Sequence, residues 1–402
     1  MPRYNGGFIG TDGLDAPDSP TIDSVTAGDQ QVSVAFTAPT DTGTSAITGF
    51  VAQVSTDGTD YSAGSNTGTS SPIVVTSLTN DTAATVKVWA INAYGTSAPS
   101  DASSSFTPAV LQRALFGGGT TGSTVDTIDY IEIATTGNAS DFGNLSANRD
   151  RLVGLSSATR GLFAGGEEGG SAVNKIEYVT LNTLGNTTDF GDLRFTSGAY
   201  FQGACSSATR GLIKGGLTDV DIQYVTIASA GNASDFGDMT VARYSLACCS
   251  STTRGIAAGG QGNMTANKTE IIDYVTIAST GDSTDFGDLS DRRHSLGSAS
   301  SSTRGTFAGG AYGPSTYSNV IEYITIASTG NGTDFGDLTN SRSYLSGAAG
   351  LTRAVFAGGS TGSLVNTIDY ITIGTTGNAT DFGDMQSARR WYGACSSAHG
   401  GL

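Results

Sequence analysis

The sequence predicts an all-β protein, and three features support this fold class. Charged residues make up 14% of the 402 residues, well below the roughly 25% of ordinary globular domains. The chain contains 57 glycines together with abundant Ser and Thr, a composition typical of short strands joined by tight turns. Period-two alternation over residues 17–107 gives way to an internal repeat from residue 111 onward, which indicates two different β architectures.

The charge and hydropathy of the chain argue against several partners. The formal net charge of −16 disfavours sequence-independent binding to nucleic acid and to anionic membranes, because both surfaces repel an acidic protein. No run of about 18 apolar residues is present, and the first residues lack the continuous apolar segment of a secretory signal. We therefore expect a chain that folds in a cytosol, without nucleic-acid binding or membrane insertion.

Cysteine and histidine are too scarce for a disulfide framework or a His-based metal site. Three of the four cysteines fall at the same position of different repeats, beyond disulfide reach of one another. We interpret the cysteines as small buried apolar side chains, and we predict no metal and no cofactor. The four residues are Cys205, Cys248, Cys249 and Cys395.

Residues 17–107 are predicted to form a small β-sandwich. Four segments alternate between apolar and polar residues and are separated by Gly, Asn, Asp and Pro turns. The segments are 31–39, 47–58, 73–78 and 84–100.

Within this part, the stretch VKVWAINAYGTSAPS (86–100) resembles strand F, the Asn-x-x-Gly turn and the start of strand G of a fibronectin type III domain. Pro20 matches the early proline of that family. Phe36 stands where the family has a buried tryptophan, and Ala84 stands where it has a corner tyrosine. The resemblance implies a sandwich that acts as a spacer or as a binding module, and we favour the spacer.

Residues 108–402 contain six repeats, marked by a recurring Asp-Phe-Gly phrase. A phrase found six times is architecture rather than a nucleotide site. Each repeat has a strand of small residues, a strand that ends in a glycine pair, an apolar strand with one tyrosine and the short Asp-Phe-Gly strand, which predicts one four-stranded antiparallel sheet per repeat. We expect the phenylalanine to be buried between neighbouring sheets, the glycine to allow close backbone approach, and the aspartate to cap a turn. The preceding Thr-Gly-Asn is expected to form the hairpin tip. The aspartates are Asp141, Asp189, Asp235, Asp285, Asp334 and Asp381.

The repeats resemble those of kelch β-propellers over about 290 residues. Each of the six glycine pairs, given below by its first glycine, matches the family's glycine pair, and one tyrosine per repeat matches the family's tyrosine. The Asp-Phe-Gly phenylalanine stands where the family has an outer-strand tryptophan, so the chain resembles a divergent branch. The glycines are Gly118, Gly165, Gly215, Gly259, Gly309 and Gly358; the tyrosines are Tyr130, Tyr178, Tyr224, Tyr274, Tyr323 and Tyr370.

The two ends of the repeat region are predicted to meet. The first repeat begins at residue 111 without a strand of small residues, whereas the C-terminal segment supplies a seventh copy of that strand with no partner of its own. We therefore expect residues 390–398 to complete the first sheet and to close a six-bladed ring, which removes an open sheet edge.

Residues 1–16 are too short and too rich in glycine to fold alone. Their Asn-Gly-Gly-Phe-Ile-Gly core resembles the opening of marine bacteriophage structural proteins of the cyanophage type. The resemblance implies that this arm docks onto other virion proteins. The candidate docking residues are Arg3, Tyr4, Phe8 and Ile9.

Two sets of variable loops are expected on one face of the ring: those that follow the glycine pairs and those that link one sheet to the next. Arginines and aromatic residues cluster in the linking loops, and such residues suit planar sugar rings and carboxylated saccharides. An alternative is that the arginines at one shared register, including Arg149 and Arg293, tie sheets together; repeat two has Ser197 there. The ligand-binding candidates are Trp391, Arg390, Tyr392, Tyr312, Tyr317, Phe195, Tyr244 and Tyr344.

These observations lead to a functional expectation. We predict a non-enzymatic virion protein, a tail fibre or decoration protein exposed on the particle surface, that docks by its arm and presents the propeller to a host-surface receptor, a glycan in the first instance. The chain could assemble as a homo-oligomer. No catalytic residues are assigned. The alternatives are a purely structural decoration protein and a polysaccharide-processing enzyme, which would need two carboxylates about 5–10 Å apart in a cleft.

Overall fold

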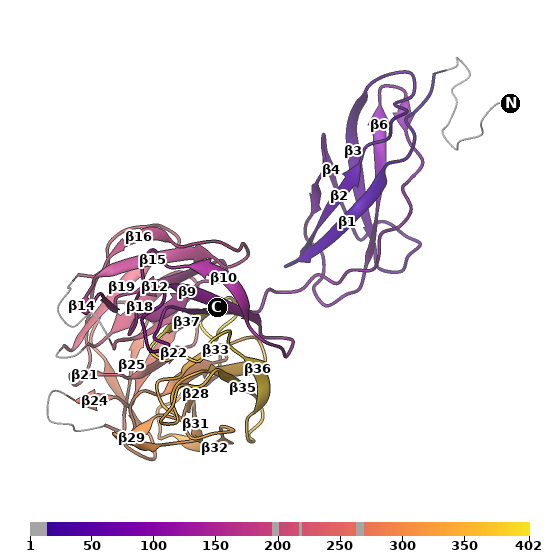
Figure 1. The fold of residues 1–402 in the computed structure, drawn as a ribbon. Coiled ribbons are helices and arrows are strands. Elements are labelled where there is room, and N and C mark those ends of the chain that lie inside the picture. The colour runs from indigo at the N-terminus through magenta and orange to yellow at the C-terminus, as the bar shows by residue number, and fades with distance from the viewer. Residues whose placement is uncertain (1–13, 195–200, 217–218, 263–268) are drawn as a thin grey trace. The chain divides into compact units, whose positions relative to one another are not determined.

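The computed structural model describes residues 14–194, 201–216, 219–262 and 269–402 (Figure 1). The described residues form an all-β protein built of small antiparallel sheets, as the composition predicted. None of the described segments is a helix long and apolar enough to cross a membrane. Contacts divide the chain into two compact units, Met1–Leu111 and Gln112–Leu402.

The first unit contains two antiparallel sheets. One has the strand order β1-β2-β5, with β1 (Thr21–Gly28), β2 (Gln31–Thr37) and β5 (Ile73–Val75). The other has the order β4-β3-β6-β7, with β4 (Gly64–Gly68), β3 (Ile47–Ser55), β6 (Thr85–Asn92) and β7 (Gly95–Thr96).

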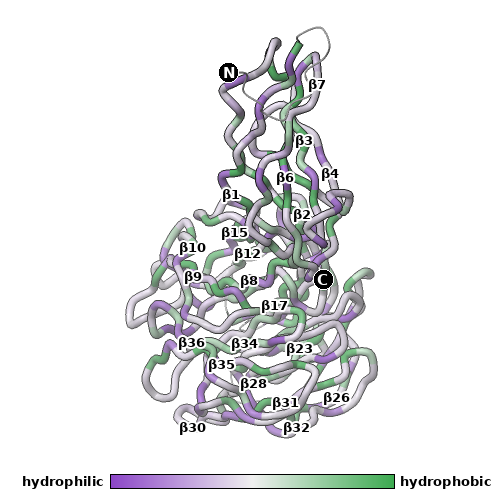
Figure 2. Tube along the Cα trace, turned by 90° about the vertical axis from the view of Figure 1, so that its right-hand side faces the viewer, coloured by the Kyte–Doolittle hydropathy of each residue, from purple (hydrophilic) through white to green (hydrophobic). Residues whose placement is uncertain are grey.

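Alternation along the strands builds the core of this unit. Figure 2 shows hydrophobic and hydrophilic residues in close alternation along β3 and β6, and every second residue of β6 is buried. Phe36 is 4% exposed and packs against Phe50, with ring centroids 4.8 Å apart. The four predicted strand segments therefore contain strands, and β1 and β4 were not predicted.

The segment after β7 differs from the predicted strand. The backbone N–H of every third residue donates to a carbonyl of β6, and the hydroxyl of the same serine accepts an N–H from that β6 residue. Every third residue of this segment thus pairs with every second residue of β6, so the edge of β6 is covered without a regular strand. The pairs are Ser97 with Ala90, Ser100 with Val88, and Ser103 with Val86.

The described residues of the second unit form six four-stranded antiparallel sheets, and the predicted count of strands per repeat is confirmed. Sheet 1 contains β10 (Ser140–Asn144), β9 (Thr127–Glu132), β8 (Arg113–Gly117) and β37 (Gly393–Ser396). Sheet 2 contains β11 (Val153–Ser156), β12 (Arg160–Ala164), β15 (Lys175–Thr180) and β16 (Thr188–Asp192). Sheet 3 contains β17 (Gly203–Ser206), β18 (Arg210–Lys214), β19 (Asp221–Thr226) and β20 (Ser234–Asp238). Sheet 4 contains β22 (Ala247–Ser250), β23 (Arg254–Ala258), β25 (Ile271–Thr276) and β26 (Thr284–Asp288). Sheet 5 contains β27 (Gly297–Ser300), β28 (Arg304–Ala308), β31 (Val320–Thr325) and β32 (Thr333–Asp337). Sheet 6 contains β33 (Ser346–Ala349), β34 (Arg353–Ala357), β35 (Thr367–Thr372) and β36 (Thr380–Asp384).

The described loops of this unit also contain three two-stranded ladders outside the four-stranded sheets. They are β13 (Glu167–Glu168) with β14 (Ser171–Ala172), β21 (Arg243–Tyr244) with β24 (Gln261–Gly262), and β29 (Ala311–Gly313) with β30 (Thr316–Tyr317).

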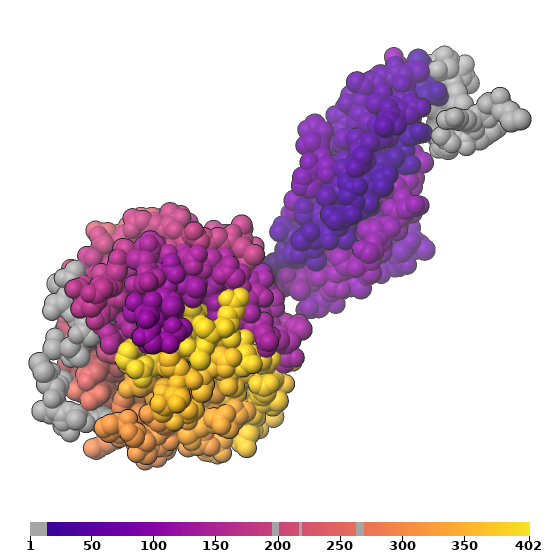
Figure 3. All heavy atoms as spheres, viewed as in Figure 1, coloured from indigo at the N-terminus to yellow at the C-terminus, as the bar shows by residue number. Residues whose placement is uncertain are grey.

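The inner strands of the six sheets form a closed cycle. In order, β37, β11, β17, β22, β27 and β33 each contact the next, and β33 contacts β37. The C-terminal strand β37 pairs with β8, with Gly393 opposite Gly117 and Ser396 opposite Ala114. Figure 3 shows the yellow C-terminal residues packed beside the purple residues that begin this unit. The predicted closure between residues 390–398 and the first repeat is therefore confirmed.

The Asp-Phe-Gly strands tie each sheet to its neighbour. The six phenylalanines are 2–3% exposed, as predicted. The Thr-Gly-Asn segment is not the predicted hairpin tip: it runs beside the outer strand of the preceding sheet, where Gly377 N–H donates to the carbonyl of Phe335 at 2.8 Å. Asn378, rather than Asp334, accepts the backbone N–H of Asp337 at 3.0 Å. The cap therefore acts across a sheet boundary, which a single repeat does not reveal.

A second inter-sheet contact comes from the arginine that begins each second strand. Arg304 lies over the ring of Tyr323 at 4.2 Å from the centroid and donates to the carbonyl of Ile373 in the next sheet at 2.8 Å. Tyr323 in turn meets Phe335 edge-on, with ring centroids 6.0 Å apart. Equivalent Tyr–Phe pairs recur in the other five sheets.

A glycine substitution tests the close approach of neighbouring sheets. Gly336 has φ +144°, and a Cβ atom there would lie 2.5 Å from the carbonyl oxygen of Gly377. We expect Gly336→Ala to lower the free energy of unfolding by about 1–3 kcal/mol, because the backbone is strained and the sheets must separate. Gly374 has no atom within 4 Å of its Cβ position, so Gly374→Ala should change stability by less than about 0.5 kcal/mol. Equal effects of the two substitutions in chemical denaturation would contradict the close approach.

Candidate functional site

Buried arginines between consecutive sheets tie the sheets of the second unit together. Each is at most 1% exposed and forms an ion pair with a carboxylate on the third strand of the following sheet. The backbone carbonyl of Arg293 also accepts the N–H of Gly260 in the preceding sheet at 2.9 Å. These interactions favour the alternative in which the arginines tie sheets together. The pairs are Arg149–Glu177, Arg243–Asp273, Arg293–Glu322, Arg342–Asp369 and Arg389–Asp129.

The described residues of sheet 3 contain no such ion pair. Gln223 takes the place of the carboxylate in β19, and Ser197, which takes the place of the arginine, lies outside the described residues. Gln202 donates its side-chain N–H to the carbonyl of Gly215 at 3.0 Å, and Gly215 corresponds to Gly259, whose carbonyl accepts from Arg243 at 3.0 Å. Both the carboxylate and the arginine of the ion pair are thus replaced by uncharged residues at this boundary.

A ring of six residues with positive φ lies at one end of the axis, and we call it the mouth ring. Their φ angles run from +53° to +62°. The backbone N–H groups of five of the six residues each donate to the carbonyl of the preceding member of the ring, at distances from 2.6 Å (Arg151 to Trp391) to 3.1 Å (Phe201 to Arg151). The mouth ring consists of Arg151, Phe201, Ser245, Ser295, Tyr344 and Trp391.

The side chains of the mouth ring are kept at a conformational cost. A left-handed backbone is unfavourable by about 1–2 kcal/mol for residues other than glycine. The chain places glycine at many other positions of positive φ, including both members of the Gly309–Gly310 pair. Bulky side chains at strained positions point to a role that glycine could not fill.

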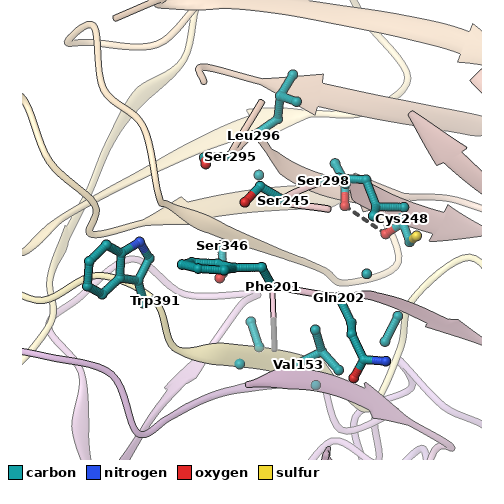
Figure 4. A pocket seen from close by; sticks show the side chains of 18 of the residues that line it. Val153, Phe201, Gln202, Ser245, Cys248, Ser295, Leu296, Ser298, Ser346 and Trp391 are labelled. Atoms are coloured by element: carbon teal, nitrogen blue, oxygen red, sulfur yellow. Dashed lines mark hydrogen bonds between the residues drawn. The ribbon is translucent and has the colours of Figure 1, made fainter. Parts of the chain in front are cut away.

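The mouth ring encloses a cavity of about 140 Å³ together with the first residues of the inner strands. Figure 4 shows Trp391 next to Phe201, with Ser245 and Ser295 on another side of the pocket. The ring centroid of Trp391 lies 5.5 Å from that of Tyr344 and 5.9 Å from that of Phe201. The cavity therefore has an aromatic side and a hydroxyl side.

Two guanidinium groups stack on the ring of Trp391. Arg390 lies 3.9 Å from the ring centroid of Trp391, and Arg151 lies 4.5 Å from it. Arg151 also forms an ion pair with Glu167 and lies 3.6 Å from a carboxylate oxygen of Asp150. Burial raises the pKa of the Asp150 carboxyl, and Arg151 opposes that shift.

Among the described residues, thirteen buried polar side-chain atoms have no hydrogen-bond partner, and six of them belong to the mouth ring or to residues next to it in the sequence. Buried polar groups are usually paired, and three of the six atoms belong to residues that line the cavity, which favours a site for a hydrogen-bonding ligand. These three are Arg151 Nε, Gln202 Oε1 and Trp391 Nε1, and the other three are Asp150 Oδ1, Ser343 Oγ and Arg390 Nε.

The structure sorts the predicted binding residues. Trp391 and Tyr344 belong to the mouth ring, Arg390 stacks on Trp391, and Tyr244 lies 6.2 Å from Phe201 between ring centroids. Tyr392 also lines the cavity, but it is 3% exposed, meets Phe116 edge-on and donates to the carbonyl of Ala357, so most of its side chain packs in the core.

Two of the remaining predicted residues lie elsewhere in the described structure, and the others fall outside the described residues. Tyr312 and Tyr317 lie on the β29–β30 hairpin and do not line the mouth cavity among the described residues, and the Tyr312 hydroxyl lies 3.2 Å from Ser318 Oγ. Phe195 lies outside the described residues. The docking candidates Arg3, Tyr4, Phe8 and Ile9 do so as well.

The predictions missed Arg151 and Phe201. Arg151 follows the buried Arg149 by two residues, as Tyr344 follows Arg342 and Trp391 follows Arg389. This shared offset was the available signal.

The cysteines behave as predicted. All four are free and buried, and burial raises the pKa of the Cys395 thiol to about 12, which leaves the thiol protonated at neutral pH. Across the described residues, no group of three or more His, Cys, Asp or Glu side chains could hold a metal ion.

Two adjacent arginines test the buried pairs. Arg293 and Glu322 are at most 1% exposed, whereas Arg292 is 69% exposed and pairs with Glu270. We expect Arg293→Met to lower the free energy of unfolding by about 3–5 kcal/mol, because it leaves a buried carboxylate unpaired. Arg292→Met should lower it by less than about 1 kcal/mol. The assigned role is wrong if urea denaturation gives the two variants similar stabilities.

Glycine substitution tests the strain in the mouth ring. Ser245 has φ +53°, so Ser245→Gly should raise the free energy of unfolding by up to about 1 kcal/mol. Ser279, an exposed turn residue outside the set with positive φ, is the control, and Ser279→Gly should leave stability unchanged or lower it slightly. A loss of stability in Ser245→Gly that matches the control would show that the mouth ring is not strained.

Known proteins do not place this arrangement in a family. No protein-family model matches the chain, and no curated protein matches its sequence.

Proposed function

We propose that this chain is a non-enzymatic adhesion protein whose mouth ring binds a glycan on a host surface. In this proposal the second unit is a six-bladed kelch-like β-propeller, and the sugar sits in the cavity at the mouth ring. The observation that carries the proposal is the retention of Arg151, Phe201, Tyr344 and Trp391 at strained backbone positions around one cavity.

The chemistry of the mouth ring suits a sugar. Aromatic rings such as those of Trp391 and Tyr344 stack against the apolar face of a pyranose, while hydroxyl and N–H groups bind its edge. Trp391 Nε1 and Arg151 Nε belong to residues that line the cavity and are buried donors without a hydrogen-bond partner among the described residues. Ser245 and Ser295 add hydroxyls on the other side of the cavity.

The proposal includes a place on a virus particle. The first unit serves as a fibronectin type III-like spacer, and residues 1–16 dock onto other virion proteins of a bacteriophage, either in a tail fibre or in a decoration protein. The support is the sequence resemblance of the arm and of residues 86–100. Several copies on one particle would convert weak sugar contacts into tight attachment.

An enzymatic function has one observation in its favour. Asp150 and Glu167 both contact Arg151, and burial raises the pKa of Asp150, as in a general acid. However, the described lining of the mouth cavity contains neither carboxylate. The pair is better explained as a support for Arg151, and adhesion is the preferred function. A purely structural decoration protein would not need the mouth side chains.

Binding to printed glycans tests the proposal. We expect the purified protein to bind host-derived glycans on an array, and Trp391→Ala to weaken that binding by at least about tenfold, because central aromatic anchors dominate such interfaces. Tyr94, a 49% exposed residue of the first unit, is the control, and Tyr94→Ala should bind normally. The proposal fails if the wild-type protein binds neither glycans nor host cells, or if Trp391→Ala remains folded and binds like the wild type.

A further inference from the structure

Two further rings of residues lie on the inner strands below the mouth ring. The first, the waist, is shared by the mouth cavity and a second cavity of about 60 Å³. The second, two residues further along each strand, is the serine ring, since alternate residues of a strand face the same side. The waist consists of Gly154, Ala204, Cys248, Ser298, Gly347 and Ala394. The serine ring consists of Ser156, Ser206, Ser250, Ser300, Ala349 and Ser396.

The hydroxyls below the mouth are bonded around the circumference. Ser206 Oγ donates to the carbonyl of Ser156, and Ser250 Oγ donates to the carbonyl of Ser206, both at 2.7 Å. In the waist, Ser298 Oγ donates to the carbonyl of Cys248 at 2.7 Å (Figure 4). These hydroxyls are committed to the ring, so the unpaired polar atoms of the site remain at the mouth.

Residues 399–401 cross the axis beyond the serine ring. His399 Nε2 lies 3.0 Å from the carbonyl oxygen of Ser156 in sheet 2 and 3.2 Å from Ser206 Oγ in sheet 3. Gly400 N–H donates to the carbonyl of Ser300 in sheet 5 at 2.9 Å. A Cβ atom on Gly401 would overlap the carbonyl of Ser206, so the backbone itself fills this space.

The bonds of His399 keep this closure in one form. Gly401 N–H donates to His399 Nδ1 at 3.1 Å, which leaves Nε2 to carry the proton and to donate to Ser156. Burial lowers the pKa of His399, so the neutral ring is the stable form at neutral pH. Among the described residues, the axial space is therefore open at the mouth ring and closed beyond the serine ring.

From this geometry we infer that the mouth receives a single terminal sugar residue, end-on, and does not bind residues within a glycan chain. The inference rests on the proposed function. The cavity of about 140 Å³ is smaller than the roughly 300–1,000 Å³ of pockets for larger ligands. An internal residue continues in two directions, and both continuations would have to leave through the opening that the mouth ring surrounds.

Matched saccharides test end-on recognition on the full chain. The probes are an array that prints each common monosaccharide once as the non-reducing terminus of an oligosaccharide and once as an internal residue, with the free methyl glycosides as competitors. We expect the terminal form to bind at least about tenfold more tightly than the internal form, and the corresponding methyl glycoside to compete fully. Equal binding of both forms overturns end-on recognition but leaves the proposed function intact. Binding to no printed or host glycan overturns both.

A variant that fills the cavity gives an independent test. Ser245→Trp places a large side chain in the mouth and should reduce binding of the terminal form by at least about tenfold, while Ser279→Trp should bind like the wild type. Unfolding curves establish whether Ser245→Trp is folded. Unchanged binding by a folded Ser245→Trp overturns the inference, and the competition by methyl glycosides decides the matter if this variant fails to fold.

Discussion

The pairing of β37 with β8 is the interaction on which the rest of the second unit depends. It joins residues about 280 positions apart, with Cys395 opposite Leu115 and Ala394 opposite Phe116. Without it, β8 would present an open edge and the cycle of inner strands would be broken between β33 and β11. The mouth ring, the waist and the serine ring each need all six inner strands, so every feature of the candidate site follows from this closure.

Contacts between sheets supply the stability that a single sheet lacks. Strands of four to six residues in a four-stranded sheet bury little apolar surface alone. Here each boundary combines a buried phenylalanine, an arginine over a tyrosine and, at five of the six boundaries, a buried Arg–carboxylate pair. The replacement of both partners around sheet 3 fits the physics of buried charge, because a Glu in place of Gln223 would lack the arginine that pairs with its counterparts in the other sheets. The same arginines fix the loop two residues before the mouth ring, which links the stability of the ring to the geometry of the site.

Much of the fold could be predicted from the sequence because the repeats carry it. The recurring Asp-Phe-Gly phrase gave the number of sheets, and the surplus strand of small residues at the C-terminus gave the closure. The cap by Asn378 could not be predicted, because it acts on the preceding sheet and a repeat read alone assigns the turn to itself. The candidate site was found only in part. Arg151 and Phe201 were missed because nothing in their residue types signals a positive φ. The packing of Tyr392 in the core could not be predicted either, because its partner Phe116 lies at the other end of the repeat region.

The closure of the ring can be measured directly by native-state hydrogen exchange. The amides of residues 393–397 should exchange as slowly as those of β27 (Gly297–Ser300), an inner strand that pairs within its own repeat. Such protection would show that β37 is held in the ring as firmly as any other inner strand. Exchange of these amides at the rate of an exposed turn, with β27 still protected, would contradict the closed ring and the candidate site that depends on it.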